Sequence, residues 1–510
     1  MKFLEALISA ALVLVPFAEA QNLDVILRNG TVVDGSGSAP VRTDVGISGD
    51  RIVFVGSSAG KKAKRVIDSS GLVITPGFID PHTHTAGDLT DPKRSQNAPY
   101  LMQGVTTVAT GNDGDSPEQI GETLARWSRQ GIGTNAALFI GQGTVRREVM
   151  EMSDAKPTPQ QMEKMKALVD TAMNEGAIGL STGLYYAPGS YATTEEVIEL
   201  ARVAAEHGGI YDTHMRDEST YNIGLMNSVR ETLRIGEEAH IPVMISHIKA
   251  LGADVWGQST GVIALIDAAH KAGIKATASE YPYDASGTSV TAALVPRWAE
   301  ADGKLLKNID DSSLHERLVK EMTENLRRRG GAETLLMTAA EDKSILGKNL
   351  AQIAQERNIS PIEAALQIIR GGGSDVASFN MKESDIEAFM KQPWVMTCSD
   401  GSDGHPRKYG TFPRKIHEYV YEKHVLSLEA AVRSSTSLPA ETLQIKDRGL
   451  LKQGYYADVL VFDPKTFIDR ATYQDPTVLA TGVEYLLVNG QLAVNKGELT
   501  STRAGRVLRH

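Results

Sequence analysis

Eight short apolar runs alternate with amphipathic helical patterns through the middle of this 510-residue chain, and this alternation restricts the fold more than any other feature. The pattern TTEEVIELARVAAEHGG, for example, ends in the glycines that commonly terminate a helix. Strands that each return through a helix form a parallel sheet, and eight such units close a barrel. We therefore predict an α/β fold of the (β/α)8, TIM-like type, with an open doubly wound sheet as the alternative. The predicted strands cover residues 77–84, 104–112, 135–141, 177–182, 210–214, 243–247, 275–281 and 395–400.

Both ends of the chain show a different pattern, in which β-like runs are broken by turn dipeptides. Asn-Gly and Asp-Gly interrupt DVILRNGTVVDGSG near the start, and VEYLLVNGQLAVNKGEL near the other end has the same character. This pattern predicts a small composite β-domain formed by residues 21–75 and 441–500, with the barrel in residues 76–440. The interval between the seventh and eighth strands, residues 286–393, contains further helical patterns, and we predict that this insertion covers the barrel mouth.

Residues 1–20 have the pattern of a secretory signal peptide. Lys2 precedes an apolar stretch, and Ala18-Glu19-Ala20 supplies a small-residue cleavage site. We expect cleavage after Ala20 and a periplasmic or secreted protein, with an uncleaved anchor or a helix of the fold as the alternatives. No later segment of the sequence is apolar for long enough to cross a bilayer, so we expect no membrane anchor in the mature chain. The single cysteine, Cys398, excludes an intrachain disulfide.

The charge balance bears on the kind of partner. Apolar residues make up 41% and charged residues 23% of the chain, as in an ordinary globular protein. A net charge of −10 argues against a nucleic-acid-binding protein, because such proteins carry a basic domain. A cationic site in this chain would therefore be a local feature within an acidic background. We make no prediction of the oligomeric state.

Histidines and aspartates follow five of the predicted strands. They are His82 and His84 at the first strand, Asp113 after the second, His214 at the fifth, His247 at the sixth and Asp400 at the eighth. In a barrel of this type the carboxyl ends of the strands meet at one end and carry the active site. Side chains two residues apart on a strand share a face, so His82 and His84 can point to one centre. Imidazole and carboxylate ligands suit zinc, with cobalt, manganese and nickel as competitors.

Three cationic residues lie close to these predicted metal ligands. Arg216 and Lys249 each stand two residues beyond a predicted ligand, and Arg407 follows the eighth strand. Cations around a metal predict a small anionic substrate, with a carboxylate near its reactive bond. The alternative is that they pair with nearby acidic residues, namely Asp217, Glu218 or Asp403.

Several longer segments resemble those of a known family. PGFIDPHTH after a β-rich start is similar to the amidohydrolase superfamily, and GVTTVATGNDG, ISHIKALG, YPYDASGTS and HPRKYGTFPR resemble the D-aminoacylase (N-acyl-D-amino-acid deacylase) family. The similarity runs from about residue 24 to residue 498. It implies a metal-dependent hydrolase that cleaves the amide of N-acyl-D-amino acids to a carboxylate and a free D-amino acid.

The resemblance also implies roles for individual residues. The four histidines named above would be ligands of one or two zinc ions, and Asp400 would be both a ligand and the proton shuttle. Lys249 and Arg407 would hold the carboxylate of the substrate. Tyr186 and Tyr281 match positions that line the substrate pocket of the family.

Two positions depart from the family pattern. Asp113 stands where the family usually carries a cysteine that holds the metal tightly, and Gly287 stands where the family tends to have serine. A carboxylate can bridge two divalent ions but is a harder ligand than a thiolate, so we predict weaker zinc retention and more tolerance of cobalt or manganese. The alternative for Asp113 is a turn-capping role. Thr288 or Ser289 can supply the hydroxyl that Gly287 lacks.

Other functions remain open on the sequence alone. One is a different activity within the same superfamily, such as a dipeptidase or a cyclic-amide hydrolase. Another is a non-catalytic periplasmic protein that binds a metal or an acidic ligand. A set of acylated amino acids, dipeptides and hydantoins separates these possibilities by which compound is hydrolysed.

Overall fold

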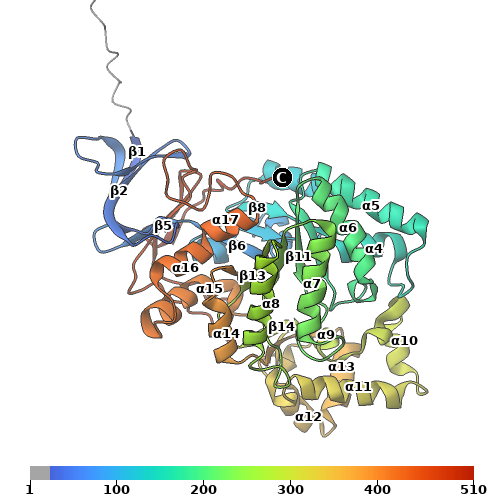
Figure 1. Ribbon diagram of the computed structural model, residues 1–510. Helices are drawn as coiled ribbons and strands as arrows, with labels where there is room; N and C mark the ends of the chain where they lie inside the picture. The colour runs from blue at the N-terminus through green and yellow to red at the C-terminus, as the bar shows by residue number, and fades with distance from the viewer. Residues whose placement is uncertain (1–22) are drawn as a thin grey trace, which may run out of the picture.

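A closed barrel of parallel strands lies at the centre of the computed structural model, which describes residues 23–510 (Figure 1). The predicted signal peptide, residues 1–20, lies outside the described residues. The barrel strands are β6 (Phe78–Thr83), β7 (Val105–Thr110), β8 (Asn135–Leu138) continued by β9 (Ile140–Gly141), β10 (Gly179–Gly183), β11 (Ile210–His214), β12 (Val243–Ile245), β13 (Ala276–Glu280) and β17 (Val395–Thr397). The last strand closes onto the first, because the backbone amide of Asp400 donates to His82 O at 3.0 Å and that of His84 to Gly401 O at 3.1 Å. The predicted (β/α)8 barrel is therefore confirmed.

Helices cover the barrel, so its strands are buried on both faces. All residues of β6, β7 and β11 are buried. Ile79, Phe139 and Met244 belong to one core cluster, to which Leu438 and Leu443 also belong. The helices of the barrel region are α1 (Ala86–Thr90), α2 (Ala98–Leu101), α3 (Ile120–Gln130), α4 (Gln142–Met150), α5 (Pro159–Asn174), η1 (Gly189–Tyr191), α6 (Thr194–Glu206), α7 (Leu225–Ala239), α8 (Ser259–Lys271), α14 (Glu383–Met390), α15 (Arg407–Arg414), η5 (Lys415–Glu422), α16 (Leu428–Ser435) and α17 (Ser437–Thr442).

Both ends of the chain build a second, nine-stranded sheet beside the barrel (Figure 1). Its strands are β1 (Leu23–Val32), β2 (Val41–Ser48), β3 (Arg51–Gly56), β4 (Ala63–Asp68) and β5 (Val73–Pro76) from the N-terminal part, and β18 (Val459–Phe462), β19 (Val483–Val488), β20 (Gln491–Asn495) and β21 (Glu498–Leu499) from the C-terminal part. The two parts join where β5 pairs with β1 on one side and with β18 on the other. The composite β-domain is confirmed. The chain then returns to the barrel, where the Leu508 amide donates to Ala136 O at 2.8 Å.

The insertion between the seventh and eighth barrel strands forms a unit with its own core. It contains a three-stranded sheet of β14 (Ala285–Ser289), β16 (Ser374–Phe379) and β15 (Leu335–Ala340), with helices α9 (Val290–Leu294), η2 (Arg297–Gly303), α10 (Leu305–Asp310), α11 (His315–Arg328), η3 (Ala332–Thr334), η4 (Lys343–Ile345), α12 (Leu350–Arg357) and α13 (Pro361–Arg370). These elements share a separate hydrophobic cluster and lie at the opposite end of the molecule from the β-domain (Figure 1). The predicted insertion boundary of 393 extends too far, because α14 packs on α8, β13 and β17 and so belongs to the barrel. No helix among residues 23–510 is long and apolar enough to cross a membrane.

A buried polar network joins the β-domain to the barrel. The Arg448 guanidinium pairs with Asp458, next to β18, and donates to Asn489 Oδ1 at 2.7 Å. Asn135 of β8 donates to Asp458 Oδ2 at 3.1 Å and accepts from Asn489 Nδ2 at 2.8 Å. Each buried polar group therefore finds a partner across the interface, which fixes how the two units sit on one another.

Candidate metal centre and active site

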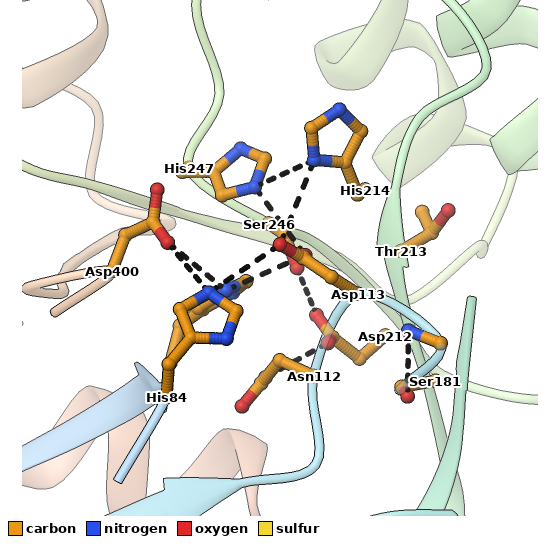
Figure 2. A network of polar contacts seen from close by, with 12 residues as sticks. His84, Asn112, Asp113, Ser181, Asp212, Thr213, His214, Ser246, His247 and Asp400 are labelled. Atoms are coloured by element: carbon orange, nitrogen blue, oxygen red, sulfur yellow. Dashed lines mark hydrogen bonds and ion pairs between the residues drawn. The ribbon is translucent and has the colours of Figure 1, made fainter. Parts of the chain in front are cut away.

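Asp113 lies at the centre of the predicted ligands, which meet at the C-terminal ends of the barrel strands (Figure 2). Its two carboxylate oxygens face different histidines. Oδ1 lies 3.4 Å from His82 Nε2 and 3.4 Å from His247 Nε2. Oδ2 lies 3.5 Å from His84 Nε2 and 3.7 Å from His214 Nδ1. A single carboxylate is thus shared by four histidines from three strands, β6, β11 and β12.

Asp400 completes the group from the last strand. Its Oδ1 lies 3.0 Å from His84 Nε2 and 3.5 Å from His82 Nε2. Asp113, His247 and Asp400 all have left-handed backbones, with φ of 57°, 33° and 46°. Such conformations are unfavourable for residues other than glycine, and they are concentrated at functional sites. Each lies just past the end of its strand, and the local backbone aims the side chain at the centre.

A second layer of buried polar groups positions the loop that carries Asp113 (Figure 2). Asn112 donates to Asp212 Oδ2 at 2.8 Å, and Ser246 donates to Asp212 Oδ1 at 2.5 Å. The Gly114 amide donates to Ser181 Oγ at 3.2 Å. The residues on both sides of Asp113 are therefore held by β10, β11 and the end of β12.

The donor atoms fit a divalent metal ion. His82 Nδ1 and Nε2 and Asp113 Oδ1 are buried and have no hydrogen-bond partner within residues 23–510. Ligand atoms of His82, Asp113, His247 and Asp400 all lie within 4.8 Å of one another. A second group of this kind consists of His214, Glu218 and His247. Imidazole and carboxylate ligands in two overlapping groups suit one or two ions of the zinc type.

The electrostatics of the site point the same way. Burial opposes the ionisation of both carboxyl groups. The neighbouring histidines outweigh it at Asp113, and Arg407 together with the histidines outweighs it at Asp400, so both pKa values lie below the usual range. Burial also opposes protonation of His247, but nearby carboxylates raise its pKa to about 10. Clustered carboxylates therefore dominate the site, and a metal cation neutralises such a cluster.

Two of the three predicted cations line the cavity above these ligands. Lys249 Nζ lies 2.7 Å from Glu218 Oε1, as in the ion-pair alternative, and 2.7 Å from His247 Nδ1. Arg407 Nη1 lies 2.7 Å from Asp400 Oδ2, a partner that we did not anticipate. Both side chains are nearly fully buried, so each is oriented by its carboxylate partner.

Arg216 does not reach the cavity, and this part of the sequence prediction is corrected. Its guanidinium donates to both carboxylate oxygens of Glu231, with Nε at 2.9 Å from Oε2 and Nη2 at 2.9 Å from Oε1. It also donates to the backbone oxygens of Ser190 and Ala192. Because β11 ends at His214, the strand periodicity no longer applies to Arg216, which turns away into a structural ion pair.

The cavity itself has a volume of about 560 Å³ and is lined by the four other predicted substrate-binding residues. These are Tyr186, Tyr281, Thr288 and Ser289. The Ser289 hydroxyl caps α9 by accepting from the Ala292 amide at 3.0 Å. A Cβ at Gly287 would lie 2.7 Å from Arg407 Nη2, so a serine there would require this buried guanidinium to move.

Four further residues of the site were not predicted as functional candidates from the sequence. Glu218 follows His214 by four residues in THMRDE, and its spacing from that histidine was the available signal. Tyr185, Tyr221 and Arg329 line the cavity. Arg329 comes from the insertion, and nothing in its local sequence, ENLRRRGG, marks one of the three arginines as different.

The barrel, its ring of buried imidazole and carboxylate ligands and the cations above it define a metal-dependent hydrolase of the barrel type. A sequence profile of the amidohydrolase family matches residues 65–494. D-aminoacylase from Alcaligenes xylosoxydans xylosoxydans is 34% identical over 96% of this chain and 98% of that protein. The chain belongs to the amidohydrolase family.

Solved structures of similar proteins agree with this assignment. An N-acyl-D-glutamate deacylase from Bordetella bronchiseptica, in complex with zinc and a phosphonate inhibitor that mimics the tetrahedral intermediate, aligns with a TM-score of 0.84 and 30% identity, covering 96% of this chain and 100% of that chain. A D-aminoacylase, described as having a binuclear metal centre with one-metal activation and second-metal attenuation, aligns with a TM-score of 0.83 and 34% identity over the same shares.

Proposed function

We propose that this protein is a zinc-dependent hydrolase that cleaves N-acyl-D-amino acids to a carboxylate and a free D-amino acid. The observation that carries the proposal is that Lys249 and Arg407 line the same cavity as the histidines and carboxylates around Asp113. The substrate needs a carbonyl to be attacked and, close to it, a carboxylate to be bound. An N-acyl amino acid has both groups at this spacing.

Asp400 is the group that moves the proton. A divalent metal ion held by the ligand cluster would lower the pKa of a water molecule and polarise the scissile carbonyl. Asp400 takes the proton of the attacking water and then delivers it to the leaving nitrogen. Its Oδ2 is free of the histidines and faces Arg407 at 2.7 Å, so this oxygen is placed on the side of the substrate.

Lys249 and Arg407 bind the carboxylate of the substrate, which partly replaces their present carboxylate contacts. Glu218 positions Lys249, since it also lies 3.2 Å from His247 Nδ1 and so ties the lysine to the ligand cluster. Tyr281 supports both cations, because its ring centroid lies 4.7 Å from Arg407 Cζ and 5.8 Å from Lys249 Nζ.

Zinc is the proposed resident ion, supported by the imidazole and carboxylate donors and by the zinc in the N-acyl-D-glutamate deacylase structure. We further propose that the enzyme acts outside the cytoplasm, because its first 20 residues have the pattern of a signal peptide. The mass of the protein recovered from cell fractions tests this: a mature chain in the exported fraction that begins at Gln21 is expected, and a full-length cytoplasmic chain would contradict it.

The function is tested with a substrate panel assayed in parallel with zinc, cobalt and manganese. The panel contains matched N-acetyl-D- and N-acetyl-L-amino acids, dipeptides and hydantoins. Hydrolysis of the D-series with the L-series at least tenfold slower is the expected result, on the order of what a misplaced substrate group costs. Preference for dipeptides or hydantoins would replace the proposal by another amidohydrolase activity. Ligand-induced stabilisation without any product would favour a binding protein.

A further inference from the structure

One wall of the active-site cavity comes from the insertion and carries a buried arginine. Arg329 directly follows α11 and is 2% exposed. It lines the same cavity as the metal ligands. Its Nε donates to Ala293 O at 3.3 Å and its Nη2 to Tyr185 Oη at 3.2 Å. Its Nη1 is buried without any hydrogen-bond partner in residues 23–510.

Arg329 also lacks an acidic partner, unlike the other cations that line the cavity. Lys249 pairs with Glu218 and Arg407 pairs with Asp400. No ion pair to Arg329 is formed by any residue from 23 to 510. Burial opposes protonation of its guanidinium, and the neighbouring groups that raise its pKa are tyrosines, not carboxylates. An uncompensated buried charge is strongly unfavourable, so its presence beside an active site points to a bound anion.

A second unpaired donor lies next to Arg329. The Tyr221 hydroxyl is buried and has no partner within the described chain. The Arg329 guanidinium lies 5.8 Å from the centroid of the Tyr221 ring. The Tyr185 hydroxyl gives its own hydrogen to Ala292 O at 2.7 Å, so toward Arg329 it acts as the acceptor. Arg329 Nη1 and the Tyr221 hydroxyl are therefore two donors that no atom of residues 23–510 uses.

Tyr185 connects this corner to the metal centre. Its ring stacks on His214, with centroids 5.6 Å apart and an interplanar angle of 25°. Its hydroxyl contacts Arg329. A single aromatic ring thus separates the unpaired donors from a metal ligand. A group that extends from the reacting amide by about one side-chain length can reach Arg329 while the amide stays at the metal centre.

We propose that Arg329 and Tyr221 form an anion subsite that binds a second carboxylate of the substrate. This inference rests on the proposed function and deepens it. Lys249 and Arg407 bind the α-carboxylate, and Arg329 binds a carboxylate carried either by the amino-acid side chain or by the acyl group. Planar guanidinium groups bind carboxylates with two parallel hydrogen bonds, for which Nη1 is available here. The preferred substrates therefore carry two carboxylates.

The test measures kcat and KM for four substrates that separate the two sources. N-acetyl-D-glutamate and N-acetyl-D-aspartate carry the carboxylate in the side chain, N-succinyl-D-leucine carries it in the acyl group, and N-acetyl-D-leucine is the neutral reference. For the wild type we expect kcat/KM to be about 10- to 100-fold higher for one dianionic class than for N-acetyl-D-leucine. Arg329→Met should remove this preference, mainly by raising KM for the dianionic substrates.

Arg328→Met is the matched control. Arg328 is the preceding residue, and its guanidinium also lies near the Tyr221 ring, at 5.5 Å from the centroid. It is paired with Glu324 and donates to Asn325, and it does not line the active-site cavity. The substrate preference should be the same in this variant as in the wild type. Arg329→Lys should keep part of the preference, and Tyr221→Phe should reduce it.

The outcomes separate the two proposals. Hydrolysis of N-acetyl-D-leucine with no preference for dianionic substrates, or a preference that survives Arg329→Met, would overturn the subsite and leave the proposed function intact. No hydrolysis of any N-acyl-D-amino acid would overturn the proposed function. If Arg329→Met fails to fold, as shown by its thermal unfolding, Arg329→Lys and Tyr221→Phe decide the question by the same ratio of kcat/KM values.

Discussion

Asp113 is the residue on which both halves of the metal centre depend, because each of its carboxylate oxygens faces a different pair of histidines. The sequence alone allowed a turn-capping role for Asp113. The structure instead buries Oδ1 among imidazoles without a hydrogen bond. If the resemblance is right in placing a cysteine at this position, Asp113 changes the hardness of the ligand there and does not remove it.

Asp113→Cys should tighten zinc binding and narrow the choice of metal. A thiolate is a softer ligand than a carboxylate and favours zinc over manganese. The measurement is metal content after dialysis against a mild chelator, together with activity restored by zinc, cobalt and manganese. Wild-type protein that retains stoichiometric zinc under this treatment would contradict the prediction. Asp113→Asn, which keeps the shape but not the charge, is the control and should retain less metal than the wild type.

Asp400→Asn should remove most of the turnover. General acid–base groups contribute about 10²- to 10⁴-fold to rate, and the amide cannot accept the proton of the attacking water. The histidine ligands are unchanged, so the metal content should fall much less than kcat does. Single-turnover assays and metal analysis of the same preparation check this. Retention of more than half of the wild-type kcat would rule out Asp400 as the proton shuttle.

Lys249→Ala and Arg407→Ala should chiefly raise KM if these residues hold the α-carboxylate of the substrate. A hydrogen bond to a charged group contributes about 1.5–3 kcal/mol, which corresponds to about a 10- to 150-fold change in KM. An amide analogue that lacks the α-carboxylate should be insensitive to both changes. Equal losses for the acid and the amide substrates would show that the two cations act on something other than this carboxylate.

At the level of elements, the barrel strands could be predicted from the sequence because a parallel sheet covered by helices needs continuous apolar runs. The same reasoning placed His82, which lies within β6. It was wrong for Arg216 because β11 ends two residues earlier, and strand periodicity stops where the strand stops. Arg329 could not be predicted, since it reaches the cavity only through the fold of the whole insertion.

The buried Lys415, at the start of η5, makes the stability of the protein depend on pH. Its ammonium group is buried and donates to Thr397 at 2.7 Å and Ser434 at 3.0 Å, which joins η5 to β17 and α16. Burial lowers its pKa from 10.5 to about 8, against the opposing influence of Glu280. The folded protein therefore binds fewer protons than the unfolded chain between these pH values, so its free energy of unfolding rises with pH across this window.

Relative to Lys415→Met, which cannot titrate, the wild type should gain about 2–3 kcal/mol of stability between pH 7 and pH 10. Urea unfolding of both proteins across this range provides the measurement. The comparison cancels the titration of groups that the two proteins share. A difference in unfolding free energy that stays constant with pH would mean that the ammonium group is not desolvated as the structure indicates.

At the scale of the whole molecule, the polar network around Asp458 holds the β-domain on the barrel. Asp458→Ala leaves Arg448 buried without its carboxylate, and breaking a buried ion pair in this way costs about 3–5 kcal/mol. The double variant Arg448→Met with Asp458→Ala should recover part of this loss, because no charge is then left unpaired. Arg234→Ala, which breaks an exposed pair with Glu238, should cost less than about 1 kcal/mol.

Chemical denaturation gives the free energies of unfolding of the wild type, Asp458→Ala, Arg448→Met, the double variant and Arg234→Ala. The first four proteins form the double-mutant cycle that gives the coupling between Arg448 and Asp458. An Asp458→Ala variant as stable as Arg234→Ala would show that the interface does not depend on this network.

The seam between β5 and β18 has a consequence for how the polypeptide is made. β5 is synthesised early, yet one of its two edges stays unpaired until β18, near the other end of the chain, has been made. A nascent chain interrupted before that point would expose an unpaired strand edge, with which other unfinished chains can pair. Because the sheet is built from both ends of the chain, only a completely translated protein can cover this edge and so avoid aggregation.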